Sequence, residues 1–191
     1  MNKNIKKAFG KGKAFIPFIT CGNPSLAVTE RIVYAMEEAG ADLIELGIPF
    51  SDPTAEGPVI QAANVRALSG GVTTDKIFDL VRRIRQKTSI PMVFMTYANV
   101  VYSYGTERFA KVAAEIGMDG LILPDVPFEE HGLDLISLIA PTSHERIAMI
   151  AKEAEGFGIS EPKQAKKMAA QSDGVIVGSA IVKLCEKYGA D

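Results

Sequence analysis

The sequence predicts an α/β protein with a parallel sheet, and three observations support this fold class. Along the 191 residues, short apolar runs alternate with amphipathic helical patterns, which is typical of repeated βα units. Most of these runs are apolar throughout, as expected for strands covered on both faces. Most helical patterns begin just after the loop that ends a strand. This favours a closed (β/α)8 barrel over an open doubly wound sheet without deciding between them.

In the first half of the chain, three apolar runs predict strands at 14–20, 43–48 and 91–96. Ser25 follows the turn G-N-P as a helix N-cap, and the helix after it is expected to end at Gly40. Helical periodicity predicts two more helices, one over 58–68 and one over 75–87 with Thr74 as its cap.

In the second half, apolar runs predict strands at 120–124, 133–139 and 174–178. Helices are predicted over 106–117, over 144–155 and after Ser160. Two junctions do not fit a barrel. The fourth and fifth strands lie too close for a crossover helix, and the helix over 144–155 runs into the loop 156–160 with no strand between them.

Only six strands are predicted, whereas an eight-stranded barrel typically needs around 250 residues. Either the chain is an unusual fragment, or segments are absent near 129–131 and 155–157 and after Asp191. We favour absent segments. Residues 1–191 are therefore expected to form one barrel domain that is incomplete as written.

The composition excludes several classes of function. A net charge of −2 provides no broad positive surface for nucleic acid or an anionic membrane. The uncharged stretch 14–29 contains two prolines and a glycine and is no membrane span. Cys21 and Cys185 lie far apart, which favours free thiols in the cytoplasm, and His131 and His144 form no metal-binding pattern.

Three acidic residues gather in the stretch L-I-E-L-G-I-P-F-S-D-P-T-A-E-G. Glu45 lies inside a predicted strand, while Asp52 and Glu56 follow in the loop. Burial of an ionised carboxylate is costly, so the pKa of Glu45 should rise toward the range that a general acid or base needs. A structural carboxylate, bound to a neighbouring donor, explains the same residue equally well.

Two glycine-containing loops, G-F-G-I-S at 156–160 and V-G-S-A-I-V at 177–182, each place a serine ahead of a helix. Backbone N–H groups at such positions bind phosphate, and barrels often hold phosphate in their last two βα loops. Ordinary turn and cap chemistry is the alternative, but the two loops together favour phosphate.

The chemistry is expected to depend on carboxylates. No lysine lies at the carboxyl end of a predicted strand, which argues against a Schiff base, and the absence of a histidine cluster argues against a metal-assisted aldolase. Tyr97 and Asp125 also follow strands. Tyr97 is as consistent with packing as with substrate contact, and Asp125 is expected to shape its loop.

The stretch around Glu45 resembles the signature of the tryptophan synthase α-subunit family. F-I-P-F-I-T-C-G-N-P, M-T-Y-A-N, L-P-D-V-P-F-E-E, G-F-G-I-S and G-S-A-I-V are similar to other segments of that family, in the same order. The resemblance covers essentially the whole chain. It implies a TIM barrel and a lyase that, without a cofactor, cleaves indole-3-glycerol phosphate to indole and glyceraldehyde 3-phosphate.

The resemblance also implies residue roles. Glu45 matches the catalytic glutamate that moves protons to indole C3 and from the glycerol hydroxyl. Glu56 matches the second acid, which handles the indole N–H and is usually aspartate. The extra methylene could displace this carboxylate by about 1 Å, a shift able to cost on the order of a hundredfold in rate unless the loop adjusts.

Other matched positions bind the substrate or a partner. Those matching phosphate ligands are Gly158, Gly178 and Ser179, and those matching walls of the indole pocket are Phe18, Tyr97 and Phe157. Pro49, Asp52 and Asn99 match the surface that faces the β subunit in an α2β2 complex, to which indole is channelled.

The family also has segments that this chain lacks, among them a lid loop after a sixth strand, so the chain as written is expected to be a poor enzyme. Two alternatives remain. The chain could be a non-catalytic barrel that binds and activates a β subunit, or a different phosphate-binding barrel such as an isomerase.

Overall fold

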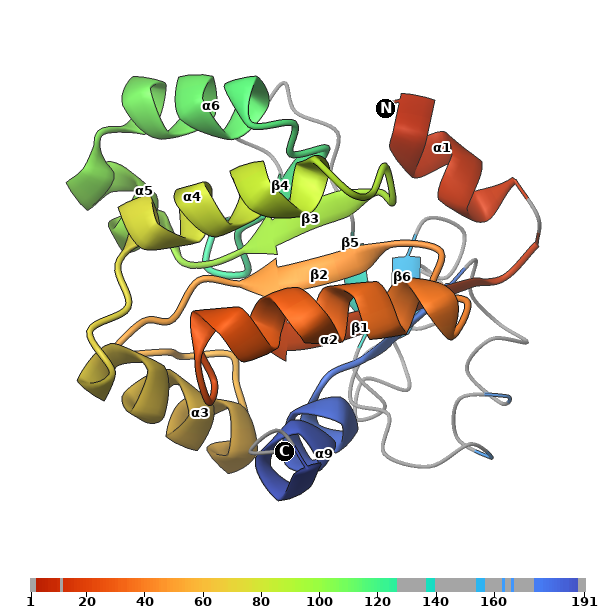
Figure 1. Cartoon of the computed structure of the whole chain (residues 1–191), viewed down its shortest axis with the longest axis horizontal. Coiled ribbons are helices and arrows are strands. Elements are labelled where there is room, and N and C mark those ends of the chain that lie inside the picture. The colour runs from red at the N-terminus through yellow and green to blue at the C-terminus, as the bar shows by residue number, and fades with distance from the viewer. Residues whose placement is uncertain are drawn as a thin grey trace.

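The computed structural model describes residues 3–10, 12–126, 137–139, 154–156, 163, 166 and 174–188. Its strands are β1 (Ala14–Thr20), β2 (Ile44–Gly47), β3 (Met92–Met95), β4 (Gly120–Ile122), β5 (Ser137–Ile139), β6 (Ala154–Gly156) and β7 (Gly174–Val177). Its helices are α1 (Lys3–Phe9), α2 (Leu26–Glu38), α3 (Pro58–Ser69), α4 (Thr74–Arg85), α5 (Ala98–Tyr104), α6 (Thr106–Glu115) and α9 (Ser179–Tyr188). Figure 1 shows their arrangement.

The sheet has the strand order β4-β3-β2-β1-β7-β6-β5, and every pairing is parallel. Strands that follow one another in the chain therefore lie side by side, except β4 and β5 at the two edges, and β1 lies beside β7. A doubly wound sheet reverses its strand order at a switch point, whereas a barrel does not. Closing this sheet would bring β4 beside β5, which is the cyclic order of a barrel.

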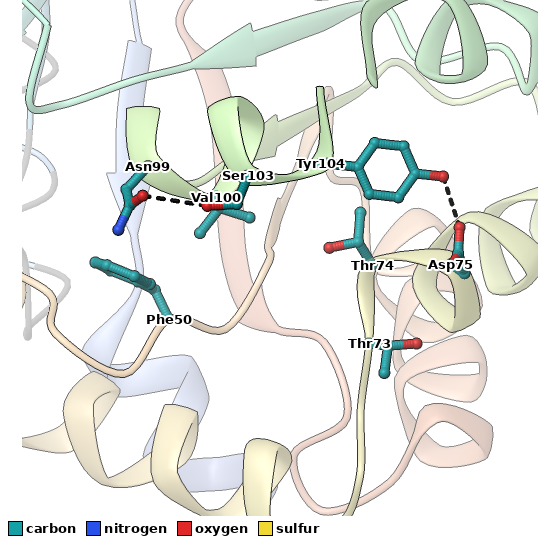
Figure 2. Close-up of a pocket in the computed structure, with 8 residues that line it drawn as sticks. All are labelled: Phe50, Thr73, Thr74, Asp75, Asn99, Val100, Ser103 and Tyr104. Atoms are coloured by element: carbon teal, nitrogen blue, oxygen red, sulfur yellow. Dashed lines mark hydrogen bonds between the residues drawn. The ribbon is translucent and has the colours of Figure 1, made fainter. Parts of the chain in front are cut away.

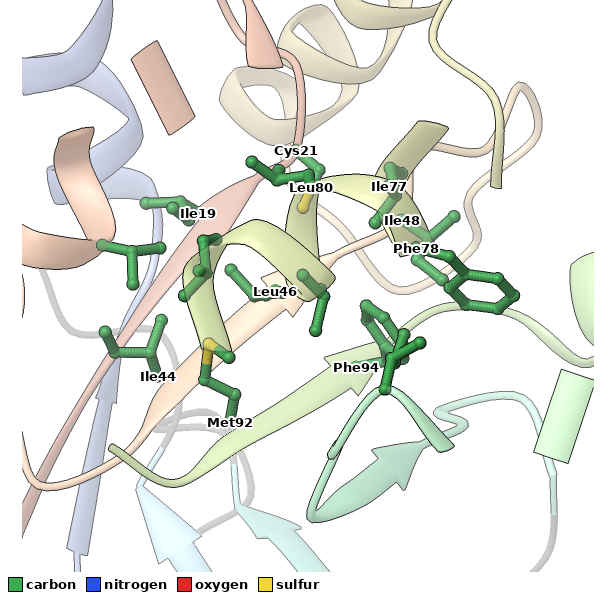
Figure 3. Close-up of a cluster of buried hydrophobic side chains, with 14 of the residues drawn as sticks. Ile19, Cys21, Ile44, Leu46, Ile48, Ile77, Phe78, Leu80, Met92 and Phe94 are labelled. Carbon is green, nitrogen blue, oxygen red and sulfur yellow. The ribbon is translucent and has the colours of Figure 1, made fainter. Parts of the chain in front are cut away.

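The strands place alternate residues on two faces, each with its own core. The outer face packs against helices α2, α4, α5 and α6, and its largest side chains come from the strand residues Ile44, Leu46, Met92 and Phe94 and the α4 residues Ile77, Phe78, Leu80 and Ile84. Figure 3 shows this cluster. The ring of Phe78 lies 5.7 Å from that of Phe94 and 5.3 Å from that of Phe109, so aromatic contacts join α4, β3 and α6.

The inner face carries the intervening residues. Hydrogen-bonded register places Phe18, Glu45, Val93 and Gly120 side by side on four adjacent strands. Its apolar cluster includes Ile16, Phe18, Leu43, Val93, Met95, Ile122 and Ile176, together with Ile60 and Ala63 of α3 and Val182 of α9. The inner face thus contains one buried carboxylate among apolar side chains.

Helix α1 covers the amino-terminal end of the inner face, because Ile5 and Ala8 belong to the inner cluster. Asn4 donates to Asp119 Oδ1 at 2.8 Å, and the same carboxylate accepts from Arg85 at 2.8 Å. This partly buried ion pair joins α1, α4 and the start of β4 at the end of the barrel away from the predicted site.

Most predicted elements are confirmed, with several corrections. Ser25 caps α2 by accepting from Val28 N–H at 3.2 Å, but the cap of α4 is Thr73 rather than Thr74. The prediction that no strand precedes the loop at 156–160 is wrong, since β6 lies at Ala154–Gly156, where a helix was expected. The described residues therefore form seven strands, whereas six were predicted. Helices α1 and α5 were not predicted.

The fifth predicted strand, 133–139, overlaps β5 (Ser137–Ile139). Its first residues, most of the helix predicted over 144–155 and most of the segment after Ser160 lie outside the described residues.

Candidate active site

Glu45 lies within β2 on the inner face and is only 3% exposed. Its register partner on β1 is Phe18, whose side chain is also buried. Parallel pairing aims register partners to the same side of a sheet, so the carboxylate and the ring are neighbours. The strand therefore holds Glu45 in an apolar surrounding, where a carboxylate can exchange protons with a bound molecule.

Glu56 lies in the loop between β2 and α3 and is partly buried. Its carboxylate Oε2 accepts a hydrogen bond from Asn64 Nδ2 at 3.0 Å, and its backbone carbonyl accepts one from Gln61 Nε2 at 2.8 Å. The Tyr97 hydroxyl donates to the same carboxylate and accepts from Ala55 N–H at 3.0 Å. The loop is thus held at the backbone of Ala55 and at both the side chain and the backbone of Glu56.

The surroundings of Glu56 make its ionisation less favourable than that of an exposed glutamate. Burial raises the pKa of Glu56 above its ordinary value, while the hydrogen bonds from Tyr97 and Asn64 act in the opposite direction. The pKa of Tyr97 is also raised, mainly by burial and further by the nearby Glu56 carboxylate. A carboxyl group whose pKa lies closer to neutrality is better suited to give and take a proton.

Phe18 lies between two glycines at the carboxyl ends of β2 and β7. A Cβ added to Gly47 would lie 2.6 Å from the Phe18 ring, whereas one added to Gly178 would lie 3.4 Å from it. The first distance is a clash and the second an ordinary contact. Gly178 and Ser179 lie where α9 begins. The predicted ligands Phe157 and Gly158 lie outside the described residues.

Tyr97 was predicted to line the indole pocket, and the structure gives it a second role. The residue is 2% exposed and follows β3 as the N-cap residue of α5. Its ring lies 5.2 Å from that of Phe50, and its hydroxyl reaches the Glu56 loop. Tyr97 therefore joins the end of β3 to the loop after β2.

Two of the three residues predicted to face a partner are exposed. Asp52 bonds to Ser51 in the loop after β2, and Asn99 accepts from Ser103 Oγ at 3.2 Å on α5, while Pro49 is buried. A cavity of about 410 Å³ adjoins this edge. Figure 2 shows it lined by Phe50, Thr73, Thr74, Asp75, Asn99, Val100, Ser103 and Tyr104.

The sequence interpretation missed Asn64 and Thr20. Asn64 is 4% exposed within α3, and the signal for it was an amide at a core-facing position of a helix directly after the loop. Thr20 ends β1 beside Gly47, and its buried hydroxyl has no hydrogen-bond partner in the described structure. Asp125 was predicted to shape its own loop, whereas the structure shows its carboxylate accepting from Ala98 N–H at 3.0 Å, at the start of α5.

No three His, Cys, Asp or Glu side chains among the described residues are grouped so that they could hold a metal ion. None of the helices in that part of the chain is long and apolar enough to cross a membrane.

Comparison with known proteins shows which family this chain resembles. The model of the family described as "Tryptophan synthase alpha chain" matches residues 4–157 and 153–191. The tryptophan synthase alpha chain of Geobacter sp. (strain M21) is 42% identical, over 92% of this chain and 85% of the relative. The crystal structure of tryptophan synthase subunit alpha from Legionella pneumophila str. Paris is 34% identical, with a TM-score of 0.83, and covers 100% of this chain and 91% of that chain.

A structure of the tryptophan synthase α2β2 complex from Pyrococcus furiosus matches with a TM-score of 0.78 and 31% identity, over 93% of this chain and 92% of that chain. The alignment with the Geobacter relative spans 226 residues, more than the 191 of this chain, so it includes positions at which this chain has no residue. The family match divides at 153–157, one of the two predicted junctions. The chain belongs to the tryptophan synthase alpha chain family.

Proposed function

We propose that this protein catalyses the α reaction of tryptophan biosynthesis with Glu45 and Glu56 as its two proton-transfer groups. The reaction is the retro-aldol cleavage of indole-3-glycerol phosphate to indole and glyceraldehyde 3-phosphate. The observation that carries the assignment is the placement of one buried and one partly buried carboxylate, on β2 and in the loop that follows it. Both lie at the carboxyl end of the sheet, where barrels carry out their chemistry.

In this mechanism, Glu45 gives a proton to indole C3 and then takes one from the hydroxyl group on the adjacent glycerol carbon. The carbon–carbon bond breaks, that carbon becomes the aldehyde of glyceraldehyde 3-phosphate, and the electron pair of the bond returns to the indole ring. Glu56 accepts the indole N–H proton while C3 is protonated and returns it as the ring regains aromaticity. Each carboxyl group ends as it began.

The substrate then lies across the inner face. Phe18 supplies an apolar wall for the indole ring. Its ring can lie close to β2 because Gly47 has no side chain there. Gly178 and Ser179 offer backbone N–H groups at the start of α9 to the phosphate. In this proposal Tyr97 and Phe157 also line the indole pocket, and Gly158 is a further phosphate ligand.

A β subunit is the proposed partner, as in the α2β2 complex from Pyrococcus furiosus. The exposed residues Asp52 and Asn99 and the cavity beside them offer a surface for it, with Pro49 buried behind. We further infer one barrel domain over 1–191 and a place in the cytoplasm. The second inference is supported by two buried free cysteines, Cys21 and Cys185.

Indole release tests the function. The purified chain is incubated with indole-3-glycerol phosphate, with and without a β subunit, and indole is quantified by chromatography. Glu45→Gln keeps the size of the side chain and removes the transferable proton, so kcat should fall by about 10²- to 10⁴-fold. The exposed Glu38→Gln at the end of α2 serves as the control and should keep full activity.

Turnover by Glu45→Gln equal to that of the unsubstituted chain would rule out this mechanism. Binding of the β subunit without any indole release would instead favour a non-catalytic partner role.

A further inference from the structure

The loop that carries Glu56 is held from two directions. Asn64 belongs to α3, which follows the loop, and Tyr97 belongs to the end of β3, the next strand. Both side chains are almost fully buried, at 4% and 2% exposed, so neither can exchange its partner for bulk water. A buried polar group that loses its partner costs about 1–3 kcal/mol, which favours the bonded arrangement.

The two contacts converge on one carboxylate. Asn64 Nδ2 lies 3.0 Å from Oε2 of Glu56, and the Tyr97 hydroxyl donates to the same group while it accepts from Ala55 N–H. The tyrosine therefore binds the backbone just before Glu56 and the side chain of Glu56 together. Gln61 binds the backbone carbonyl of Glu56 from the other side.

We propose that Tyr97 and Asn64 are positioning residues that hold the Glu56 carboxylate in place for proton transfer, and that the length of the glutamate side chain is matched to them. This inference rests on the proposed function and extends it to residues that do not themselves transfer protons. A pocket wall needs only the tyrosine ring, whereas a positioning role needs its hydroxyl.

The match in length follows from the geometry. The loop backbone is bound by Tyr97 at Ala55 and by the exposed Gln61 at Glu56, and both bonds oppose a shift of the loop toward a shorter side chain. Removal of one methylene would withdraw the carboxylate by roughly 1 Å and stretch the Asn64 bond beyond the usual hydrogen-bond range of about 2.7–3.2 Å. Aspartate at this position should therefore act less well in this chain.

Titration of Glu56 gives a readout that does not depend on activity. Besides burial, the side chains that act on its ionisation are Tyr97 and Asn64, and both favour the ionised form. Loss of either hydrogen bond should raise the pKa of Glu56 further. Carboxyl ¹³C NMR of glutamate-labelled protein measures this, with the resonance assigned by its loss in Glu56→Gln.

The variants are Tyr97→Phe, which keeps the ring against Phe50, and Asn64→Ala. The matched control is Tyr34→Phe, because the Tyr34 hydroxyl also donates to a glutamate carboxylate, that of Glu30 in α2, at 3.0 Å. We expect Glu56 to titrate at higher pH in both test variants and at its original pH in the control. The kcat for indole release should fall by about ten- to a hundredfold in the test variants only.

A double-mutant cycle between Tyr97→Phe and Glu56→Asp tests the match in length. If the hydroxyl acts through the longer side chain, Tyr97→Phe should have little further effect on kcat once Glu56 is aspartate. An unchanged Glu56 titration in folded Tyr97→Phe and Asn64→Ala would overturn the inference, as would full additivity in the cycle. Normal indole release with an unchanged titration would leave the proposed function standing and remove only the positioning roles.

Discussion

The two faces of the sheet use alternate residues of the same strands, yet they are built for different purposes. The outer face buries Ile44, Leu46 and Phe94 against helices, and its buried Thr96 hydroxyl donates to the Ile48 carbonyl at 3.4 Å. The inner face buries Glu45 in the same strand β2 and leaves the hydroxyl of Thr20 without a partner in the described structure.

A buried polar group without a hydrogen bond is costly, so the outer face follows the rule that favours stability and the inner face departs from it. The difference indicates that the outer face stabilises the fold while the inner face is organised around a substrate. Substitutions on the two faces should therefore affect stability and activity differently.

The largest effect is expected on the outer face. Phe78→Ala removes a ring that contacts the rings of Phe94, Tyr104 and Phe109, and it should lower the free energy of unfolding by about 3–5 kcal/mol. Urea unfolding measures this. Tyr102→Ala, on the exposed side of α5, is the control and should change it by less than about 0.5 kcal/mol. The contrast between faces fails if folded Phe78→Ala loses kcat while it keeps its stability.

The second effect is expected on the inner face, at the glycine beside Phe18. Gly47→Ala would place Cβ 2.6 Å from the Phe18 ring, so the ring must move. Overpacking of this kind costs about 1–3 kcal/mol in stability, and the displaced ring should also raise KM. Unfolding and steady-state indole release measure the two effects. A stable variant with normal KM would show that Phe18 is no pocket wall.

The third effect should separate binding from stability. Gly178 has room for a methyl group, with the nearest protein atom 3.4 Å from the added Cβ. The free energy of unfolding of Gly178→Ala should therefore stay within about 1 kcal/mol of that of the unsubstituted chain. KM should rise about tenfold with kcat unchanged, because the methyl group keeps the phosphate from the backbone. A variant with normal KM would argue against phosphate at this loop.

The fold was largely predictable because most strands are short apolar runs between a helix stop and a turn. The inner and outer faces follow from alternation along β1 to β4 once the strands are known. Helix α1 was not predictable in this way, because its two core contacts, Ile5 and Ala8, lie within a lysine-rich segment that gives little periodicity. Strand β6 was missed because A-E-G carries no apolar run.

The site was predictable only where a single residue departs from its surroundings. Glu45 interrupts an apolar strand, and that departure is visible in the sequence. The bonds from Asn64 and Tyr97 to Glu56 join positions 8 and 41 residues apart from it along the chain. No local pattern in the sequence marks such a pairing, since it depends on how the end of β3 and helix α3 are placed around the loop that carries Glu56.

The smallest effect is expected in the pH dependence of stability, which should differ between Glu56 at the site and Glu30 on α2. Burial raises the pKa of Glu56, so the unfolded chain releases this proton at a lower pH than the folded chain does. The stability that this proton contributes is present below the ordinary glutamate pKa and is lost as pH rises through the folded value. Glu56→Gln removes the charge and keeps one oxygen that can accept a hydrogen bond, and it should be more stable than the unsubstituted chain at neutral pH but not at pH 4.

Glu30 on α2 should behave in the opposite way. Partial burial acts to raise its pKa, but hydrogen bonds from Arg83 and Tyr34 outweigh this and lower it. Its contribution to stability is therefore present above the ordinary pKa and lost as pH falls, so Glu30→Gln should be less stable at neutral pH. Thermal unfolding of both variants from pH 4 to pH 8 measures the two trends. If both substitutions changed the stability at neutral pH in the same direction, the charge of Glu56 would affect the fold as the charge of Glu30 does. The contrast between the two sides would then be wrong.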